Sequence, residues 1–88
     1  MKVRFRSSFK KDLKRLKDPN LLFQISTVIE QRKASESLPQ VSNVSKLKGY
    51  DDFYRIRIGN FRVGIKMMGD EIILVRFLHR KEIYRFFP

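Results

Sequence analysis

The first third of the chain shows one strand-like and two helix-like patterns of apolar residues. Val3 and Phe5 alternate with basic residues, which predicts a short strand with one buried face. Apolar side chains then recur at spacings of three and four, as they do along the buried face of an α-helix. The residues with this spacing are Phe9, Leu13 and Leu16 in a first segment and Leu22, Ile25 and Ile29 in a second. We therefore expect two amphipathic helices after the strand.

Polar residues mark where these helices begin and end. Ser7 or Ser8 is suited to cap the first helix. Asp18 followed by Pro19 ends that helix and begins the next, with the aspartate as N-cap and the proline at the first helical position. Because the break is only a few residues long, the helices should form an antiparallel hairpin. The polar segment 35–45 predicts a loop.

From residue 53 onward the pattern changes to that of strands. Segments 53–58, 61–68 and about 72–78 are separated by the turn sequences Gly59-Asn60 and Gly69-Asp70, which predicts a three-stranded antiparallel meander. The predicted fold class is therefore α+β. A two-helix hairpin packs on a small antiparallel sheet in the order β-α-α-β-β-β, followed by a short C-terminal helix or tail.

A two-residue turn at Gly59-Asn60 fixes the register of the first two strands of the meander. The pairs on the buried face are then Ile58 with Phe61, Ile56 with Val63 and Tyr54 with Ile65. On the other face, the pairs are Arg57 with Arg62 and Arg55 with Gly64. Because glycine has no side chain, we expect three arginines to converge beside an open space above the sheet.

The register of the last strand depends on the second turn. A two-residue turn at Gly69-Asp70 would bury Arg76, whereas a three-residue turn would direct this side chain outward. We favour the three-residue turn because it keeps apolar residues together and spares an arginine from burial. The resulting pairs are Val63 with Val75 and Ile65 with Ile73.

The charge of the chain indicates the kind of partner it binds. Twenty Lys and Arg residues against nine Asp and Glu residues give the 88-residue chain a formal net charge of +11. Both halves of the chain are basic, and the length fits a single domain, residues 1–88. Such a charge favours a polyanion such as nucleic acid, and an acidic protein segment would satisfy the same field.

Several classes of protein are disfavoured by what the sequence lacks. It has no Cys and one His, which argues against a disulfide framework and against thiolate or structural zinc sites. No Walker loop, dinucleotide fingerprint or hydrolase elbow occurs, and we expect no cofactor. No apolar run approaches the ~20 residues of a membrane span, and no signal-peptide pattern follows the charged start. We therefore expect a cytoplasmic protein without a membrane partner.

The arginine face is the strongest candidate for chemistry. Like charges on neighbouring strands destabilise a sheet, so the cluster indicates an anion or an acidic chain that binds there, although a solvated strand face is the alternative. Phe53 and Tyr84 are suited to stack on bases, whereas Phe86 and Phe87 are more simply explained as plugs at the edge of the core. His79 is the only histidine, and a lone histidine is more often structural than catalytic.

Three segments of the chain resemble the RelE/ParE toxins. They are Leu47-Lys48-Gly49, the run from Tyr54 to Val63 that reads YRIRIGNFRV, and the run from His79 to Tyr84 that reads HRKEIY. The resemblance includes the opening strand and the first helix, and thus covers nearly the whole chain. It implies two helices packed on an antiparallel sheet to which the N-terminal strand is joined.

The resemblance also implies an activity. RelE-type toxins are endoribonucleases that cut messenger RNA in the ribosomal A site without metal, through attack of the ribose 2′-hydroxyl on the adjacent phosphate. By resemblance, the catalytic residues are Arg55 and Arg57 at the family's paired basic positions, Arg62 and Arg80 as phosphate-binding arginines, and Tyr84 as the C-terminal tyrosine. Further RNA contacts are expected from Lys46, Lys48, Phe53, His79, Lys81 and Arg85.

The sequence departs from the family pattern in one respect. The paired basic positions are lysines in the best-known RelE toxin and arginines here, and an arginine cannot act as a general base. Proton abstraction then falls to Tyr84 as first choice and to His79 as second. The segment between Arg80 and Tyr84 is also shorter than in that relative.

Two other functions fit the same fold. A ParE-like toxin would inhibit DNA gyrase as a binding module without RNA chemistry, and an inactive relative would only bind an antitoxin. The joint presence of Arg62, Arg80 and Tyr84 favours the RelE-type activity. In every case the expected partner is an acidic, disordered antitoxin that folds as it binds. For the RelE type, the other partners are messenger RNA on the ribosome and the 16S ribosomal RNA around it.

Overall fold

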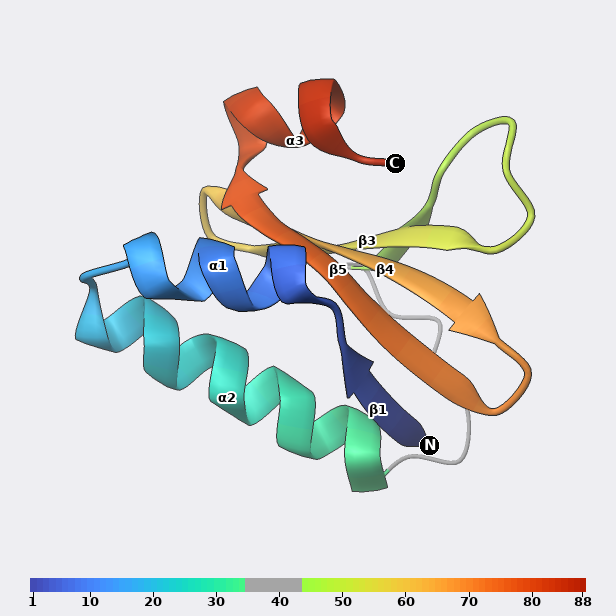
Figure 1. Cartoon of the computed structure of the whole chain (residues 1–88), viewed down its shortest axis with the longest axis horizontal. Helices are drawn as coiled ribbons and strands as arrows, with labels where there is room; N and C mark the ends of the chain where they lie inside the picture. Colours follow the sequence, from blue (N-terminus) through green and yellow to red (C-terminus); the bar gives the residue numbers. More distant parts are fainter. Residues whose placement is uncertain (35–43) are drawn as a thin grey trace.

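The structure is a computed structural model that describes residues 1–34 and 44–88. In chain order, the elements are β1 (Lys2–Phe5), α1 (Ser7–Arg15), α2 (Pro19–Ala34), β2 (Val44–Lys46), β3 (Phe53–Ile58), β4 (Phe61–Met68), β5 (Glu71–His79) and α3 (Arg80–Phe86) (Figure 1). The two predicted helices, the predicted meander and a short C-terminal helix are therefore present. Of the loop expected over residues 35–45, positions 35–43 lie outside the described residues, and Val44 and Ser45 belong to a strand.

The described strands form one five-stranded sheet in the order β1-β5-β4-β3-β2. β1 runs parallel to β5, and all other neighbours are antiparallel. The α+β class is confirmed, but the sheet is mixed rather than antiparallel because β1 joins the last strand of the chain. β2 is a further edge strand that was not predicted, because three residues are too few to show the alternation that marks a strand.

The signals at the helix ends were only partly correct. Asp18 caps α2 as predicted: its Oδ1 accepts hydrogen bonds from the backbone N–H groups of Asn20 at 3.0 Å and Leu21 at 3.2 Å. The cap predicted for α1 was wrong. The N-cap position is Arg6, which makes no side-chain capping bond, and Ser8 instead donates from Oγ to the carbonyl of Val75 at 2.6 Å.

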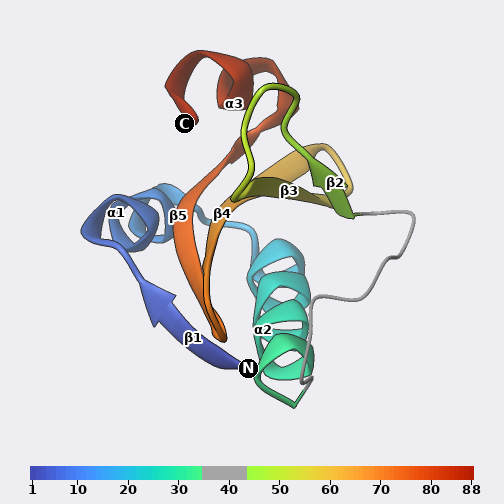
Figure 2. The ribbon, with the colours of Figure 1, turned by 90° about the vertical axis from the view of Figure 1, so that its right-hand side faces the viewer.

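The sheet separates a main core from a smaller second core. In the main core, Phe9 of α1 and Leu21 and Ile25 of α2 pack on apolar residues of β3, β4 and β5. These strand residues are Ile56, Ile58, Val63, Ile65, Ile72, Leu74 and Phe77. The second core consists of Leu47, Ile83 and Phe87 on the opposite face. Accordingly, α2 and α3 lie on opposite sides of the central strands (Figure 2).

The first helix lies along the edge of β5, beyond the end of β1. β1 pairs with β5 only as far as Leu74. Past this residue, side chains of α1 bind the strand's backbone: Ser8 donates to the Val75 carbonyl, and Asp12 Oδ2 accepts from the N–H of Phe77 at 2.9 Å. α1 thereby satisfies backbone groups that a neighbouring strand would otherwise bind.

Asp12 also forms a buried ion pair that the sequence analysis missed. Its carboxylate accepts two hydrogen bonds from Arg76, from Nε at 2.8 Å and from a terminal guanidinium nitrogen at 3.0 Å. Asp12 is 4% exposed. The sequence does indicate that Asp12 is buried. It lies three residues after Phe9, on the helix face that carries the apolar residues. A carboxylate on a buried face requires a partner.

The predicted register is correct between β3 and β4 and wrong between β4 and β5. The pairing from Ile58 with Phe61 to Tyr54 with Ile65 is as predicted. The turn after β4 has two residues rather than the expected three, because Met68 faces Glu71. A shift in pairing between Gly64 and Ile65 then adds one residue to β5. The pairs differ from those expected: Ile65 faces Leu74, Gly64 faces Arg76 and Val63 faces Phe77.

This irregularity explains how Arg76 avoids the main core. The predicted longer turn would have shifted the whole strand by one position. A β-bulge opposite Gly64 and Ile65 instead turns the β5 side chains after Leu74 to the other face, and leaves the pairing before it unchanged. Leu74 and Phe77, three residues apart, therefore both belong to the main core, whereas Val75 packs against the second core. Arg76 is left free to pair with Asp12.

The buried pair gives a test of this packing. We expect Asp12→Ala to lower the free energy of unfolding by about 3 kcal/mol, because it leaves the Arg76 guanidinium and the Phe77 N–H without their acceptor. Chemical denaturation measures this change. The control is Asp51→Ala at an exposed position, for which a change within about 0.5 kcal/mol is expected. Equal losses in the two variants would contradict the structural role of Asp12.

Candidate arginine site on the β3–β4 hairpin

The hairpin of β3 and β4 brings the predicted arginines together on one face of the sheet. Arg57 lies directly opposite Arg62, and Arg55 lies opposite Gly64, as predicted. The short turn that sets this register is possible because Gly59 adopts a φ of 56°, which favours glycine. Two positive charges therefore face each other across neighbouring strands, an arrangement that destabilises the sheet when no anion is bound.

Arg62 is the most constrained residue of this group. One terminal nitrogen of its guanidinium donates to two backbone carbonyls of the hairpin, that of Gly59 at 3.0 Å and that of Phe61 at 2.8 Å. Partial burial lowers the pKa of Arg62, and the positive charge of Arg57 lowers it further. Arg80 and Arg55 act in the same direction, so that Arg62 lies within the electrostatic field of three other arginines.

The third helix brings Arg80 and Tyr84 to the same place. The backbone N–H of Arg80 donates to the carbonyl of Asn60 at 2.8 Å, which joins the start of α3 to the β3–β4 turn. Tyr84 raises the pKa of Arg62, an effect opposite to that of the arginines. The Tyr84 ring is 73% exposed, and the guanidinium carbon of Arg55 lies 4.5 Å from its centroid, within cation–π range. All five expected catalytic residues thus form one cluster, which we call the arginine site.

His79 contacts the start of α3 and the ring of Phe61. It occupies the N-cap position of α3, and its Nδ1 accepts a hydrogen bond from the backbone N–H of Lys81 at 3.2 Å. Its ring also meets that of Phe61 edge-on, with centroids 5.5 Å apart. A neutral imidazole that accepts at Nδ1 carries its proton on Nε2. In this state Nε2–H of His79 can donate a hydrogen bond, while Nδ1 is occupied by the Lys81 N–H.

The open space expected beside the arginines is filled. The ring of Phe87 lies directly over Gly64, where an added Cβ would come within 2.6 Å of ring carbons. Phe53 is covered by this ring and by Tyr50, at centroid distances of 5.5 and 5.4 Å. Phe53 therefore contributes to the second core rather than offering a free stacking surface, and Phe87 is the core plug that was expected. Phe86, in contrast, is half-exposed.

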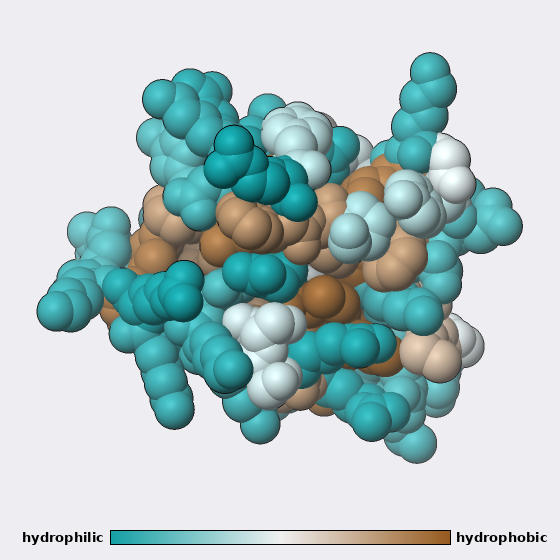
Figure 3. Space-filling model, turned by 45° about the horizontal axis from the view of Figure 1, so that its top comes forward, coloured by the Kyte–Doolittle hydropathy of each residue, from teal (hydrophilic) through white to brown (hydrophobic). Residues whose placement is uncertain are grey.

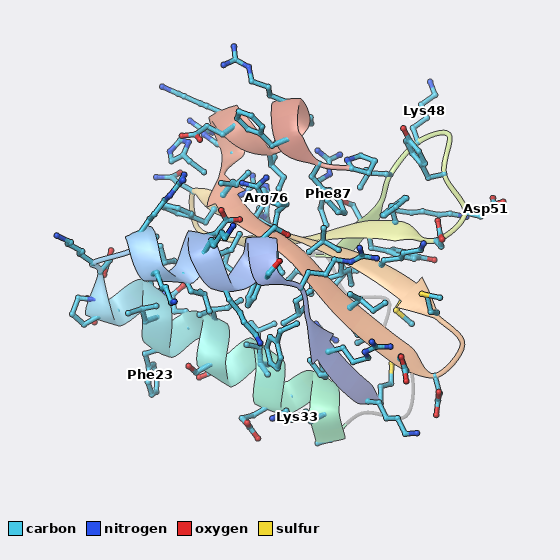
Figure 4. The ribbon with its side chains drawn as sticks, viewed as in Figure 1. Phe23, Lys33, Lys48, Asp51, Arg76 and Phe87 are labelled. Atoms are coloured by element: carbon cyan, nitrogen blue, oxygen red, sulfur yellow. The ribbon has the colours of Figure 1, made fainter. Side chains whose placement is uncertain are left out.

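The remaining residues expected to bind RNA are exposed basic side chains around this face. Lys46 lies on β2, Lys81 and Arg85 lie on α3, and Lys48 extends from the loop between β2 and β3 (Figure 4). Hydrophilic side chains cover much of the face that includes α3 (Figure 3). None of these four residues forms an ion pair with another described residue.

The described part of the chain contains neither a metal-binding cluster nor a membrane-crossing helix. In residues 1–34 and 44–88, no group of three or more His, Asp or Glu side chains lies close enough to hold a metal ion. In the same residues, no helix is long and apolar enough to cross a membrane.

Comparison with known proteins identifies the family. The model of the family described as the ParE toxin of the type II toxin-antitoxin system, parDE, matches residues 3–84. The chain is also 46% identical over 89 residues to Toxin RelE3 of Methanocaldococcus jannaschii, and this match covers 100% of both chains. The chain belongs to the RelE/ParE superfamily of type II toxins. The family and fold predicted from the sequence are therefore confirmed.

Solved structures agree with this assignment. The toxin resembles a chain in the crystal structure of the RelB-RelE antitoxin-toxin complex from Methanococcus jannaschii, with a TM-score of 0.82 and 43% identity over 97% of this chain and 99% of that one. A chain of the Escherichia coli DinJ-YafQ complex gives a TM-score of 0.62 at 18% identity, over 98% of the toxin and 97% of that chain. At this identity the second match shows the shared fold alone.

Repulsion within the arginine site can be measured directly. We expect Arg57→Gln to raise the free energy of unfolding at low ionic strength by about 0.2–1 kcal/mol, because it removes the like charge opposite Arg62. The gain should shrink as added salt screens the pair. Lys48→Gln removes one charge from an exposed loop and is the control. A loss of stability in the Arg57 variant would show that this pair is not under repulsion.

Proposed function

We propose that the toxin is an endoribonuclease that cleaves messenger RNA in the ribosomal A site and so inhibits translation. The observation that carries this proposal is the convergence of four arginines and an exposed tyrosine at one site. Arginine forks bind phosphate through paired hydrogen bonds and stabilise the charge that grows on its oxygens in the transition state. Arg62 and Arg80 are the first candidates for this role.

The proposed reaction uses the nucleophile of the substrate itself. The ribose 2′-hydroxyl oxygen attacks the adjacent phosphorus, and the bond from phosphorus to the 5′-oxygen of the next nucleotide breaks. One product ends in a 2′,3′-cyclic phosphate, and the other begins with a 5′-hydroxyl. The step requires a base that removes the 2′-hydroxyl proton and an acid that supplies a proton to the departing 5′-oxygen. It consumes no other reactant.

The chain offers few candidates for these two proton transfers. The arginines bind and stabilise but cannot act as bases. Tyr84 is the proposed base because its phenol is exposed beside Arg55. His79 is the second candidate base, and it could take the proton at Nδ1 only if the contact with the Lys81 N–H opened. Solvent water can supply the proton to the departing 5′-oxygen. The order of candidates therefore stays the one expected from the sequence, with Tyr84 first and His79 second.

An acidic antitoxin is the proposed regulator. The toxin carries a net charge of +11, and the solved relatives named above are RelB-RelE and DinJ-YafQ complexes. A segment rich in Asp and Glu would bind the arginine site and exclude RNA from it. Since ribosomes and messages are the proposed target, we place the toxin in the cytoplasm.

A second candidate function has one observation in its favour. The matching family model carries the name of ParE toxins, and the fold serves equally as a binding module. In this alternative the toxin inhibits DNA gyrase and leaves messenger RNA intact. The arginine site would then contact a protein rather than a phosphate that reacts.

The two functions are distinguished by variants of the arginine site. We expect Arg62→Ala or Arg80→Ala to reduce RNA cleavage by roughly 10²–10³-fold, because each removes a donor to the transition state. Both variants should fold, and each should keep most of its antitoxin binding because the other basic residues still attract an acidic segment. The measurement is to induce each protein in a bacterial host and map the 5′ ends of messenger RNA. Arg4→Ala, in the exposed pair with Glu71 on the β1–β5 side of the sheet, is the matched control.

New ends at codon positions in translated messages, absent from the two variants, would support the ribonuclease. Intact messages with stalled replication would support the gyrase inhibitor instead. Full toxicity of both variants would contradict the assignment of Arg62 and Arg80.

Salt dependence gives an independent test of phosphate binding. We expect the logarithm of the RNA-binding constant to fall linearly with the logarithm of salt concentration, because neutralised phosphates release counterions. Each arginine of the site replaced by Ala should reduce the slope by about 0.7. Fluorescence titration of a labelled RNA measures both quantities. A slope that is flat, or unchanged in the variants, would argue for a protein target.

A further inference from the structure

One cross-strand row of the sheet receives three aromatic side chains from the end of α3. In this row Arg55 of β3 lies opposite Gly64 of β4, which in turn lies opposite Arg76 of β5. Each position of the row meets one ring. The contacts are Tyr84 on Arg55, Phe87 on Gly64 and Phe86 on Arg76. The row therefore sets the place of the last turn of α3 on the sheet.

The contact in the middle of the row is the closest. An added Cβ at Gly64 would lie 2.6 Å from both Cγ and Cδ1 of Phe87, so the ring rests on bare backbone. The same ring meets Phe53 edge-on, with centroids 5.5 Å apart and planes at 89°. Phe87 is 4% exposed, although it follows an exposed helix turn. A ring held between a backbone surface and a second ring has little freedom to shift.

Contacts of the neighbouring residues connect Phe87 to α1 and to the last turn of α3. The guanidinium carbon of Arg76 lies 5.6 Å from the centroid of Phe86, and Asp12 of α1 holds that guanidinium with two hydrogen bonds. The backbone N–H of Phe87 donates to the carbonyl of Ile83 at 2.9 Å and closes the helix. Phe87 is the C-cap of α3, three residues after Tyr84, and its bond to Ile83 links it to the helical turn that carries Tyr84. We therefore expect a displacement of Phe87 to displace Tyr84 as well. Arg76 and Phe87 are both labelled in Figure 4.

We propose that Phe87, seated on Gly64, is a positioning residue that fixes α3 so that Tyr84 stays against Arg55 and faces the arginine site. Phe87 contacts no reacting atom and acts through Tyr84. The catalytic part of this inference rests on the proposed ribonuclease function, whereas the positional part does not. Gly64 is needed for the same contact, because any larger residue at this position would displace the Phe87 ring.

The positional part can be observed without any substrate. A proton above the face of an aromatic ring resonates upfield of its usual position, and the Arg55 side chain lies over the Tyr84 ring. The Arg55 side-chain protons in an NMR spectrum therefore report whether Tyr84 is in place. Tyr84→Leu removes the ring and supplies the reference position.

Three variants separate positioning from simple loss of packing. Phe87→Ala removes the ring, Phe87→Leu keeps an apolar plug, and Gly64→Ala removes no atom from α3 but occupies the place of the ring. Phe23→Ala is the control, since it deletes the same atoms from an exposed position on α2, where the side chain points away from the sheet (Figure 4). Thermal unfolding of each variant shows whether the fold is retained. If Phe87→Ala does not fold, Gly64→Ala decides the matter, because Val63 and Ile65 on the opposite face remain unchanged.

We expect Phe87→Ala and Gly64→Ala to move the Arg55 resonances toward the Tyr84→Leu reference. On ribosomes programmed with a short message, kcat should fall roughly 10- to 100-fold while KM stays near its wild-type value, because the base is misplaced and the phosphate contacts are kept. Phe87→Leu should restore most of both readouts. Phe23→Ala should change neither.

Two results would overturn the proposal. Wild-type Arg55 resonances in both Phe87→Ala and Gly64→Ala would show that Phe87 does not hold Tyr84. A full change in these resonances with unchanged kcat would show that the position of Tyr84 does not matter for cleavage. If the wild-type toxin cuts no RNA at all, the proposed function fails, and the Arg55 resonances still decide whether Phe87 positions Tyr84.

Discussion

The placement of α1 and α3 on this sheet depends on the Asp12 carboxylate at the edge of β5. It accepts the N–H of Phe77 and the guanidinium of Arg76, and so joins α1 to the strand where β1 has ended. Arg76 in turn contacts Phe86 of α3. A single buried anion thus connects α1, β5 and, through Arg76, α3. Because a buried charge is costly without its partner, these three elements are constrained to form together.

The arginine site shows the opposite electrostatic arrangement. Arg57 and Arg62 face each other, and neither forms an ion pair with another described residue. The main core on the other side of β3 and β4 holds the hairpin in place despite this repulsion. Stability is supplied by Ile56, Val63 and Ile65, whereas the arginines opposite them are the proposed binding site. The main core therefore stabilises one face of the hairpin, while the other face carries both the second core and the repelling arginines.

The sequence predicted most of the fold because its signals were local. Periodicity located the helices and the meander, and the turn at Gly59-Asn60 fixed the register that brings Arg55, Arg57 and Arg62 together. Features that depend on distant partners were missed. The parallel pairing of β1, the bulge opposite Gly64 and the ring over that glycine join segments that are far apart in sequence. Asp12 was the one missed residue with a local signal, a carboxylate within an apolar helix face.

The two hydrogen bonds from Arg62 to the hairpin carbonyls affect how the toxin would meet its ligand. A free arginine side chain samples many rotamers, and ordering it on contact costs about 2 kcal/mol. Here one guanidinium nitrogen is already occupied by the carbonyls of Gly59 and Phe61, so folding has restricted the side chain in advance. An arriving anion would then meet an Arg62 side chain that is already held in place. The speed of capture would then be set by diffusion and long-range attraction rather than by a slow conformational step.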